Sequence, residues 1–209
     1  MTGPGVNVLI TTASDTGRVL IELGGANGAK SAQLFVGGQP AAGLRARIGC
    51  RPDSSGRYFA VTASTFVLLD ELDREPLFRL EYLDDMRTAP SCHWQVHAER
   101  GALTHLLTLS GKQRPHQLSA LHIPVGGARL RPCLEDFLQF AIDECGVDTV
   151  AGYEDAIKEG RESWRRKQIR TAVRDVPDEA ADVLATLGYV VTPPAAGHAP
   201  TRIASLHNW

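Results

Sequence analysis

One stretch of the chain carries the strongest signals for its fold. It reads SCHWQVHAERGALTHLLTLSG over residues 91–111 and, after a polar connection, LHIPVGGARLRPCLEDFLQFAIDECG over residues 121–146. Apolar and polar side chains alternate through residues 92–99, which predicts a strand with one face on a core and a polar face that meets water, a ligand or a partner. A shorter alternating run at residues 120–125 predicts a second strand, followed by a glycine turn.

A helix is predicted directly after this turn, at residues 132–145. Pro132 suits the first helical position, where its missing N–H is not needed, and Glu135 and Asp136 place negative charge at the positive end of the helix dipole. Gly146 provides the stop. The apolar side chains recur at helical spacing: Leu134, Phe137, Leu138, Ala141, Ile142 and Cys145. The stretch therefore predicts two strands and a helix that packs on them.

The chain before residue 91 predicts further strands. Two longer strands, at residues 57–69 and 77–83, flank the charged segment DELDREP and form a predicted hairpin. Shorter β-prone runs separated by glycine-rich breaks lie at residues 6–12, 18–23, 31–36 and 44–50. The predicted fold class is α+β: a mostly antiparallel sheet of about six to eight strands, packed by a helix, with a C-terminal helical subdomain.

The chain after residue 146 is predicted to be mostly helical. A long helix spans about residues 153–174, a second spans about residues 177–187, and residues 189–192 add an edge strand. The side chains expected to face inward are Tyr153, Ile157, Gly160 and Trp164 on the long helix and Val183, Leu184 and Leu187 on the second.

These patterns divide the chain into three parts. Residues 1–146 form an α+β domain, with a glycine-rich β part at 1–56 and the sheet and helix at 57–146. Residues 147–192 form a helical subdomain, and residues 193–209 form a flexible tail.

Composition narrows the function classes. The chain has 209 residues, 43% of them hydrophobic, so it can bury a large core without a disulfide or a metal ion. The formal net charge of −2 provides no overall attraction to nucleic acid or to an anionic membrane. No run approaches the roughly 20 apolar residues of a membrane helix, so no membrane contact is expected.

Cysteine usage and the N-terminus both predict a cytoplasmic protein. The four cysteines, Cys50, Cys92, Cys133 and Cys145, form no CxxC pair, which is typical of reduced thiols. The first residues carry no basic segment followed by an apolar core, so no signal peptide is expected.

Histidines form the first candidate site. His93 and His97 share a strand face about 13 Å apart, too far to bind one metal ion together. A divalent metal would therefore use one of them with His122 from a neighbouring strand, together with Glu99 or His105. His93, His97, His122 and Glu99 are accordingly the candidate catalytic residues, as a His general base or a metal site. The alternative is a polar sheet face whose histidines bond to their neighbours. The sequence establishes no cofactor.

Two further sites rest on basic residues. Gly126 and Gly127 precede a helix N-terminus and are flanked by Arg129 and Arg131, which makes this turn a candidate anion site.

The second basic candidate site is the long helix, which carries seven Lys or Arg residues between positions 158 and 174. Arg166, Arg170 and Arg174 are four residues apart and share one face, so they are candidate contacts to a partner protein or to nucleic acid. A solvated helix face is the alternative.

Residues 78–144 resemble the TumE-type toxins of bacterial toxin–antitoxin systems. The resemblance rests on the strands FRLEYL and HWQVHAE, the histidine-bearing LHIP and the helix LEDFLQFAIDE. It is closest at residues 93–95 and 134–136, and it leaves out the first 56 residues and the C-terminal helices. The tight histidine cluster of that family is not reproduced. The resemblance implies an RNA-directed activity with His93 as a candidate residue.

Three functions follow as alternatives. The first is a cytosolic bacterial accessory or regulatory protein, in a toxin–antitoxin, phage or defence system, that binds a protein partner or forms a homo-oligomer. The second is a His- or metal-dependent hydrolase acting on RNA, DNA or nucleotide. The third is a structural subunit of a larger assembly. Binding is favoured over catalysis because the sequence completes no catalytic constellation.

Overall fold

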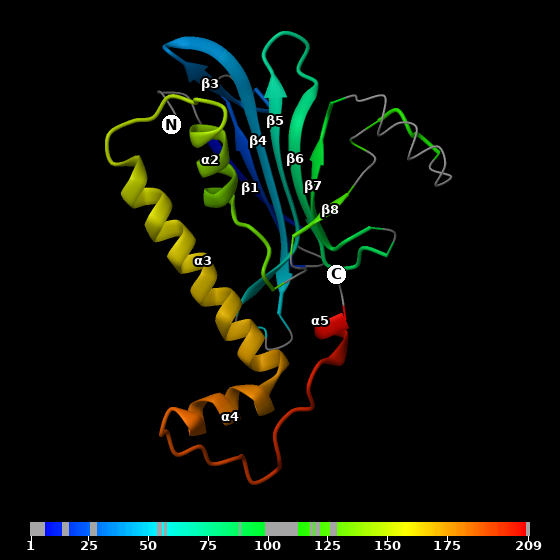
Figure 1. Cartoon of the computed structure of the whole chain (residues 1–209), viewed down its shortest axis with the longest axis vertical. Helices are drawn as coiled ribbons and strands as arrows, with labels where there is room; N and C mark the ends of the chain where they lie inside the picture. Colours follow the sequence, from blue (N-terminus) through cyan, green and yellow to red (C-terminus); the bar gives the residue numbers. More distant parts are fainter. Residues whose placement is uncertain are drawn as a thin grey trace.

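The computed structural model describes residues 7–13, 17–25, 29–53, 56, 58–87, 89–98, 113–117, 119, 122–125 and 129–207. Within them the chain forms an eight-stranded sheet in the order β1-β2-β4-β5-β6-β7-β8, with β3 also pairing with β4 (Figure 1). Every one of these strand pairs is antiparallel. Helices follow in the C-terminal part, so the predicted α+β class is confirmed.

The strands have these bounds: β1 Asn7–Ala13, β2 Arg18–Gly24, β3 Ala32–Val36, β4 Gln39–Pro52, β5 Phe59–Asp70, β6 Pro76–Leu83, β7 Cys92–Val96 and β8 Ile123–Pro124. The helices are α2 Leu134–Asp143, α3 Tyr153–Asp175, α4 Pro177–Thr186 and α5 Ile203–His207.

The front face of the sheet, which α2 covers, holds the core. Phe66, Leu80 and Trp94 lie side by side on β5, β6 and β7, as the strand register requires. Phe137 of α2 is fully buried against them, with its ring stacked on Trp94 at 5.4 Å between centroids. The predicted packing of the apolar side of β7 is therefore confirmed at Cys92 and Trp94, whereas Ala98, predicted on the same side, lies beyond β7 and is exposed.

A tight turn joins β3 to β4 and anchors the segment between α2 and α3. Gly37 and Gly38 both have positive φ angles, of 58° and 77°, as a two-residue hairpin turn requires. Their N–H groups donate to the two carboxylate oxygens of Asp148, at 2.9 and 2.7 Å. The Asp148 N–H also donates to the carbonyl of Phe35 at 2.7 Å. These bonds hold the helical part to one corner of the sheet.

Helix α2 begins two residues later than the sequence predicted. Cys133 is the N-cap, and both its N–H and its thiol donate to the Asp136 carboxylate, at 3.0 and 3.2 Å. Because this cap fixes the first turn at Leu134, Pro132 lies before the helix. The stop at Gly146 is confirmed, with a φ of 67° and an N–H that donates to the carbonyl of Ile142.

Helix α3 packs on α2 and then runs past the sheet, and α4 lies at its far end (Figure 1). The Arg161 guanidinium donates to Asp136 at 2.7 Å across the two helices. At Gly160 the helices approach so closely that a Cβ would lie 2.3 Å from Oε1 of Glu135. The predicted inward face of α3 is thus correct at Gly160 and at Ile157, which is buried.

One prediction about the C-terminal part differs from the structure. Residues 189–192 do not form an edge strand but exposed coil, because the chain has left the sheet by this point. The tail is partly tied down: the Arg202 N–H donates to the carbonyl of Asp175 at 2.8 Å, and His198 lies 2.8 Å from Asp178. Residues 203–207 form α5.

Candidate functional site

The histidine site is built from the ends of β6, β7 and β8. His93 is fully buried, at 0% exposure. Its Nδ1 lies 2.9 Å from the carbonyl oxygen of Pro90, and its Nε2 lies 3.5 Å from Oε2 of Glu81, the residue opposite it on β6. The ring of His122 meets it edge-on at 4.4 Å between centroids. The structure therefore brings His93 and His122 together and adds Glu81, which sequence reasoning did not place there.

The chemistry of this cluster is that of a buried polar contact. Nδ1 of His93 is within hydrogen-bond distance of the Pro90 carbonyl, whereas Nε2 only approaches Glu81 and makes no hydrogen bond with a described residue. A neutral ring can donate from only one of its nitrogens. The contact with His93, together with the charge of Arg79, holds the pKa of Glu81 below its usual value despite partial burial. Because His93 has no exposed surface, it cannot reach a substrate in this arrangement.

The back face of β5–β7 corrects the expected polar surface. It was predicted to meet water, a ligand or a partner, yet His93 and Gln95 are both buried there. Val67 and Leu69 of β5 are also buried but lie outside the core cluster of the front face. The alternation of apolar and polar residues along a strand predicts which side chains share a face of the sheet. It does not predict whether other parts of the protein cover that face.

Of the remaining candidate residues of this site, the structure describes only His97. His97 lies just beyond β7, where its N–H donates to the carbonyl of Leu77, and burial, with Arg79 nearby, lowers the pKa of its ring. Glu99 lies outside the described residues, as do Gly126 and Gly127. Among the residues that are described, no three His, Cys, Asp or Glu side chains are grouped so that they could hold a metal ion.

Both arginines of the candidate anion site are engaged by the protein itself. Arg129 donates to Asp175 at 2.5 Å, and that buried carboxylate also lies 3.5 Å from Arg202. Arg131 is buried, with its guanidinium 3.8 Å from the ring centroid of Tyr82 and 4.8 Å from that of Trp164. These contacts fasten α3 to the sheet, and an anion would have to compete with them.

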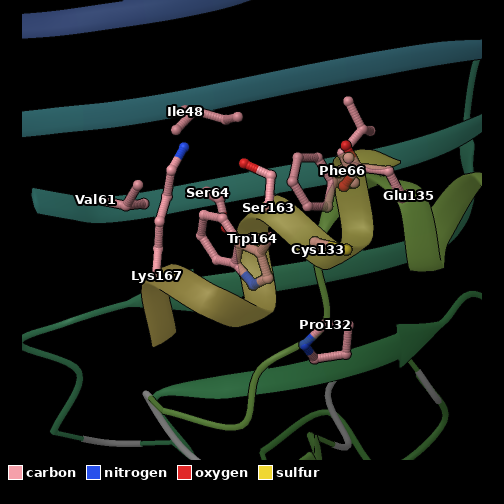
Figure 2. Close-up of a pocket in the computed structure, with 12 residues that line it drawn as sticks. Ile48, Val61, Ser64, Phe66, Pro132, Cys133, Glu135, Ser163, Trp164 and Lys167 are labelled. Carbon is pink, nitrogen blue, oxygen red and sulfur yellow. The ribbon is translucent and has the colours of Figure 1, made fainter. Parts of the chain in front are cut away.

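A pocket of about 250 Å³ lies between the middle of α3, the start of α2 and strands β4 and β5 (Figure 2). Ile48, Val61 and Phe66 line it from β4 and β5, and Trp164 lines it from α3. Polar groups are few. Lys167 extends across it toward the sheet, while Glu135 lies at the other end (Figure 2). The pocket exceeds the roughly 150 Å³ that accommodates a benzene ring, so it has room for a small apolar group.

The cysteines provide no nucleophile. All four are free thiols. Burial raises the pKa of Cys92 to about 12 and that of Cys133 to about 12, with Asp136 and Glu135 adding to the effect at Cys133. Thiols of this kind remain protonated at neutral pH and react slowly.

The C-terminal arm, residues 165–207, holds the third candidate surface. It comprises the end of α3, then α4, the following coil and α5. Arg166, Arg170 and Arg174 are exposed, as a contact surface requires. Arg166 donates to Glu162 at 2.7 Å, four residues earlier on α3. No other predicted site in the described part of the chain is as accessible.

The arm also exposes large apolar side chains. Helices α4 and α5 contain no buried residue. The exposed side chains are Ile169, Val173, Val183, Leu184, Leu187, Tyr189, Val190, Val191, Ile203 and Leu206. Val183, Leu184 and Leu187 were expected to anchor α4 inward. The apolar stripe is present, but the prediction that it packs inward was wrong. Helical spacing identifies an apolar stripe and does not identify the part of the protein, or the partner, that packs against it.

The chain was also compared with known proteins. No family model, curated protein or solved structure matches it. No helix in the described residues is long and apolar enough to cross a membrane. The function must therefore be inferred from the surfaces described above.

Proposed function

We propose that this protein is an accessory or regulatory protein that acts by binding another protein chain through its C-terminal arm. One observation supports the proposal: α4 carries an apolar stripe and buries no residue. Apolar patches that a protein leaves open in this way commonly mark contact surfaces.

Helix stability supports the same proposal. Helix α4 has ten residues, and isolated helices shorter than about 12–15 residues are marginal in water. A helix in a folded protein is normally stabilised by burying its apolar face. Full burial of a Val or Leu side chain contributes about 1.5–3 kcal/mol. A partner that covers Val183 and Leu187 would supply the stabilisation that the rest of the chain does not.

The catalytic alternatives have weaker support. His93 is inaccessible, and burial raises the pKa of all four thiols. The exposed arginines of α3 would suit nucleic acid as well as an acidic protein, but the apolar side chains beside them favour protein, since a phosphate backbone offers them no apolar surface.

The test is site-specific photo-crosslinking in the native host. A photoreactive phenylalanine analogue replaces Leu187, which is 69% exposed, and in a separate strain replaces Leu72, which is 94% exposed in the β5–β6 turn. We expect one defined protein adduct from position 187 and none from position 72. The absence of an adduct at 187, or the same adducts at both positions, would contradict the proposal.

A further inference from the structure

We propose that the chain seated on the arm is a second copy of this protein, with α4 of each copy lying along the outer face of α3 of the other. The inference rests on the proposed function and names its partner. It is supported by the opposite charges of two surfaces that both expose apolar side chains and that do not meet within one chain.

The first surface is the outer face of α3. Ile169 and Val173 are 62% and 47% exposed, and they lie one helical turn apart. The helical repeat places them opposite Gly160, which faces α2. Arg165, Arg166 and Arg170 flank them, and residues 165–174 contain no acid. This face is therefore an apolar stripe bordered mostly by positive charge, with Glu162, which pairs with Arg166, as the one acid among the residues that line a shallow depression beside Ile169.

The second surface is α4. Its apolar stripe consists of Val183, Leu184 and Leu187, and Glu179 and Asp182 border the stripe on one side, at helical spacing. Residues 177–191 include three acids and no Lys or Arg. An acidic amphipathic helix of this kind complements the α3 face in both apolar character and charge.

The two surfaces do not meet within one chain. The backbone breaks at Val176, with φ −134° and ψ 67°, and α4 turns away from α3 there (Figure 1). Across the described residues, no ion pair joins a basic residue of α3 to an acid of α4: Arg165 pairs with Asp136, and Arg166 pairs with Glu162. Asp178 is used by His198 and Thr201, which leaves Glu179 and Asp182 for another chain.

Two-fold symmetry satisfies both surfaces at once. If α4 of one copy lies on α3 of the other, rotation about the two-fold axis creates the second, identical contact. Each dimer then contains two identical contacts. In each contact, the apolar stripe of α4 from one copy covers the apolar stripe of α3 from the other, and acidic residues lie beside basic ones. A second copy is thus a partner whose chemistry is already complementary to the arm.

The test uses reciprocal charge reversal in the full-length protein. One variant carries Glu179→Lys and Asp182→Lys, and the other carries Arg166→Glu and Arg170→Glu. Sedimentation velocity measures dimerisation of the wild type, of each variant alone and of an equal mixture of the two variants. All four residues are exposed, so the fold should persist, and circular dichroism verifies this.

We expect the wild type to dimerise and each variant alone to dimerise at least about tenfold more weakly, because like charges then face each other in both contacts. The mixture should recover a heterodimer near wild-type affinity, since both contacts again join opposite charges. If α4 instead paired with α4, the Arg166→Glu/Arg170→Glu variant alone would remain dimeric, which would overturn the inference.

Two further outcomes would also overturn it. One is a wild type that stays monomeric at about 100 μM, well above typical dissociation constants of stable dimers. The other is a monomer that binds single-stranded RNA through Arg166 and Arg170, which would assign the stripe to nucleic acid. A monomer that still crosslinks a different protein from position 187 would leave the proposed function standing. A monomer with no crosslink would remove both.

Discussion

At the scale of single residues, Glu81 links the buried His93 to the edge of β6. Its lowered pKa means that the folded state prefers the carboxylate. The resulting stability is present above the unfolded pKa of about 4.3 and is lost as pH falls through the folded pKa. We expect Glu81→Gln to lower stability near pH 7 by about 1–2 kcal/mol and to weaken the loss of stability below pH 4.3.

Urea denaturation between about pH 3 and pH 7 measures both effects. Glu159→Gln is the matched control, since Glu159 is exposed and has no ion pair with any residue that the structure describes. An identical pH profile for the Glu81→Gln variant and the wild type would show that the contact with His93 contributes nothing.

Gly160 allows a second test at this scale. A Cβ at this position would lie 2.8 Å from Cδ and 2.9 Å from Cγ of Glu135. We therefore expect Gly160→Ala to destabilise the protein or leave it unchanged, although Ala is better than Gly in a helix by about 1 kcal/mol. In a Glu135→Ala background the same change should be stabilising by about 0.5–1 kcal/mol.

A double-mutant cycle from urea denaturation yields the coupling directly. Additive effects of the two substitutions would mean that Glu135 does not occupy the space beside Gly160.

At the scale of elements, Asp136 joins the start of α2 to α3. It accepts from the Cys133 N–H and thiol and pairs with Arg161. Burial would raise its pKa, but these partners together keep the pKa below its usual value. We expect Asp136→Ala to cost about 2 kcal/mol, the sum of a lost cap and a lost, partly buried ion pair.

Thermal unfolding compares this variant with Asp143→Ala, at the exposed end of the same helix. Asp143 contacts only Gln139 among the described partners, so its removal should change stability by less than about 0.5 kcal/mol. Equal losses for the two variants would contradict the role assigned to Asp136.

The elements also show what the sequence could and could not predict. Helix α3 was expected at 153–174 and is found at Tyr153–Asp175, because capping and spacing are local signals. The neighbouring positions of His93 and His122 followed from two adjacent strands. The burial of His93 did not, and neither did its contact with Glu81, because the contact depends on strand register and the burial depends on what covers the back face of the sheet. The exposure of Val183 and Leu187 likewise could not be predicted, because it depends on the position of α4 at the end of α3, away from the sheet.

At the scale of the whole molecule, protection of the arm should depend on protein concentration. Helix α4 buries nothing in one chain, so its amides should exchange rapidly with solvent in dilute protein. Dimerisation would cover it, and we expect residues 177–187 to become protected at high concentration. Helix α2, which contains buried Phe137 and Ala141, should be protected throughout.

Hydrogen exchange followed by mass spectrometry at about 1 and 100 μM makes this comparison. The exchange of α2 serves as the internal control. Rapid exchange of α4 at both concentrations would indicate that no second copy covers it.

The order of the strands has a consequence for synthesis on the ribosome. Most neighbours in the sheet are also neighbours in sequence, so β1 to β7 can pair as the chain emerges. Helix α2, which packs on the front face of these strands, begins only at Leu134. When β7 has emerged from the ribosome and α2 has not, the nascent chain therefore exposes Phe66, Leu80 and Trp94 to solvent. That interval is when this protein is most exposed to aggregation and most dependent on chaperones.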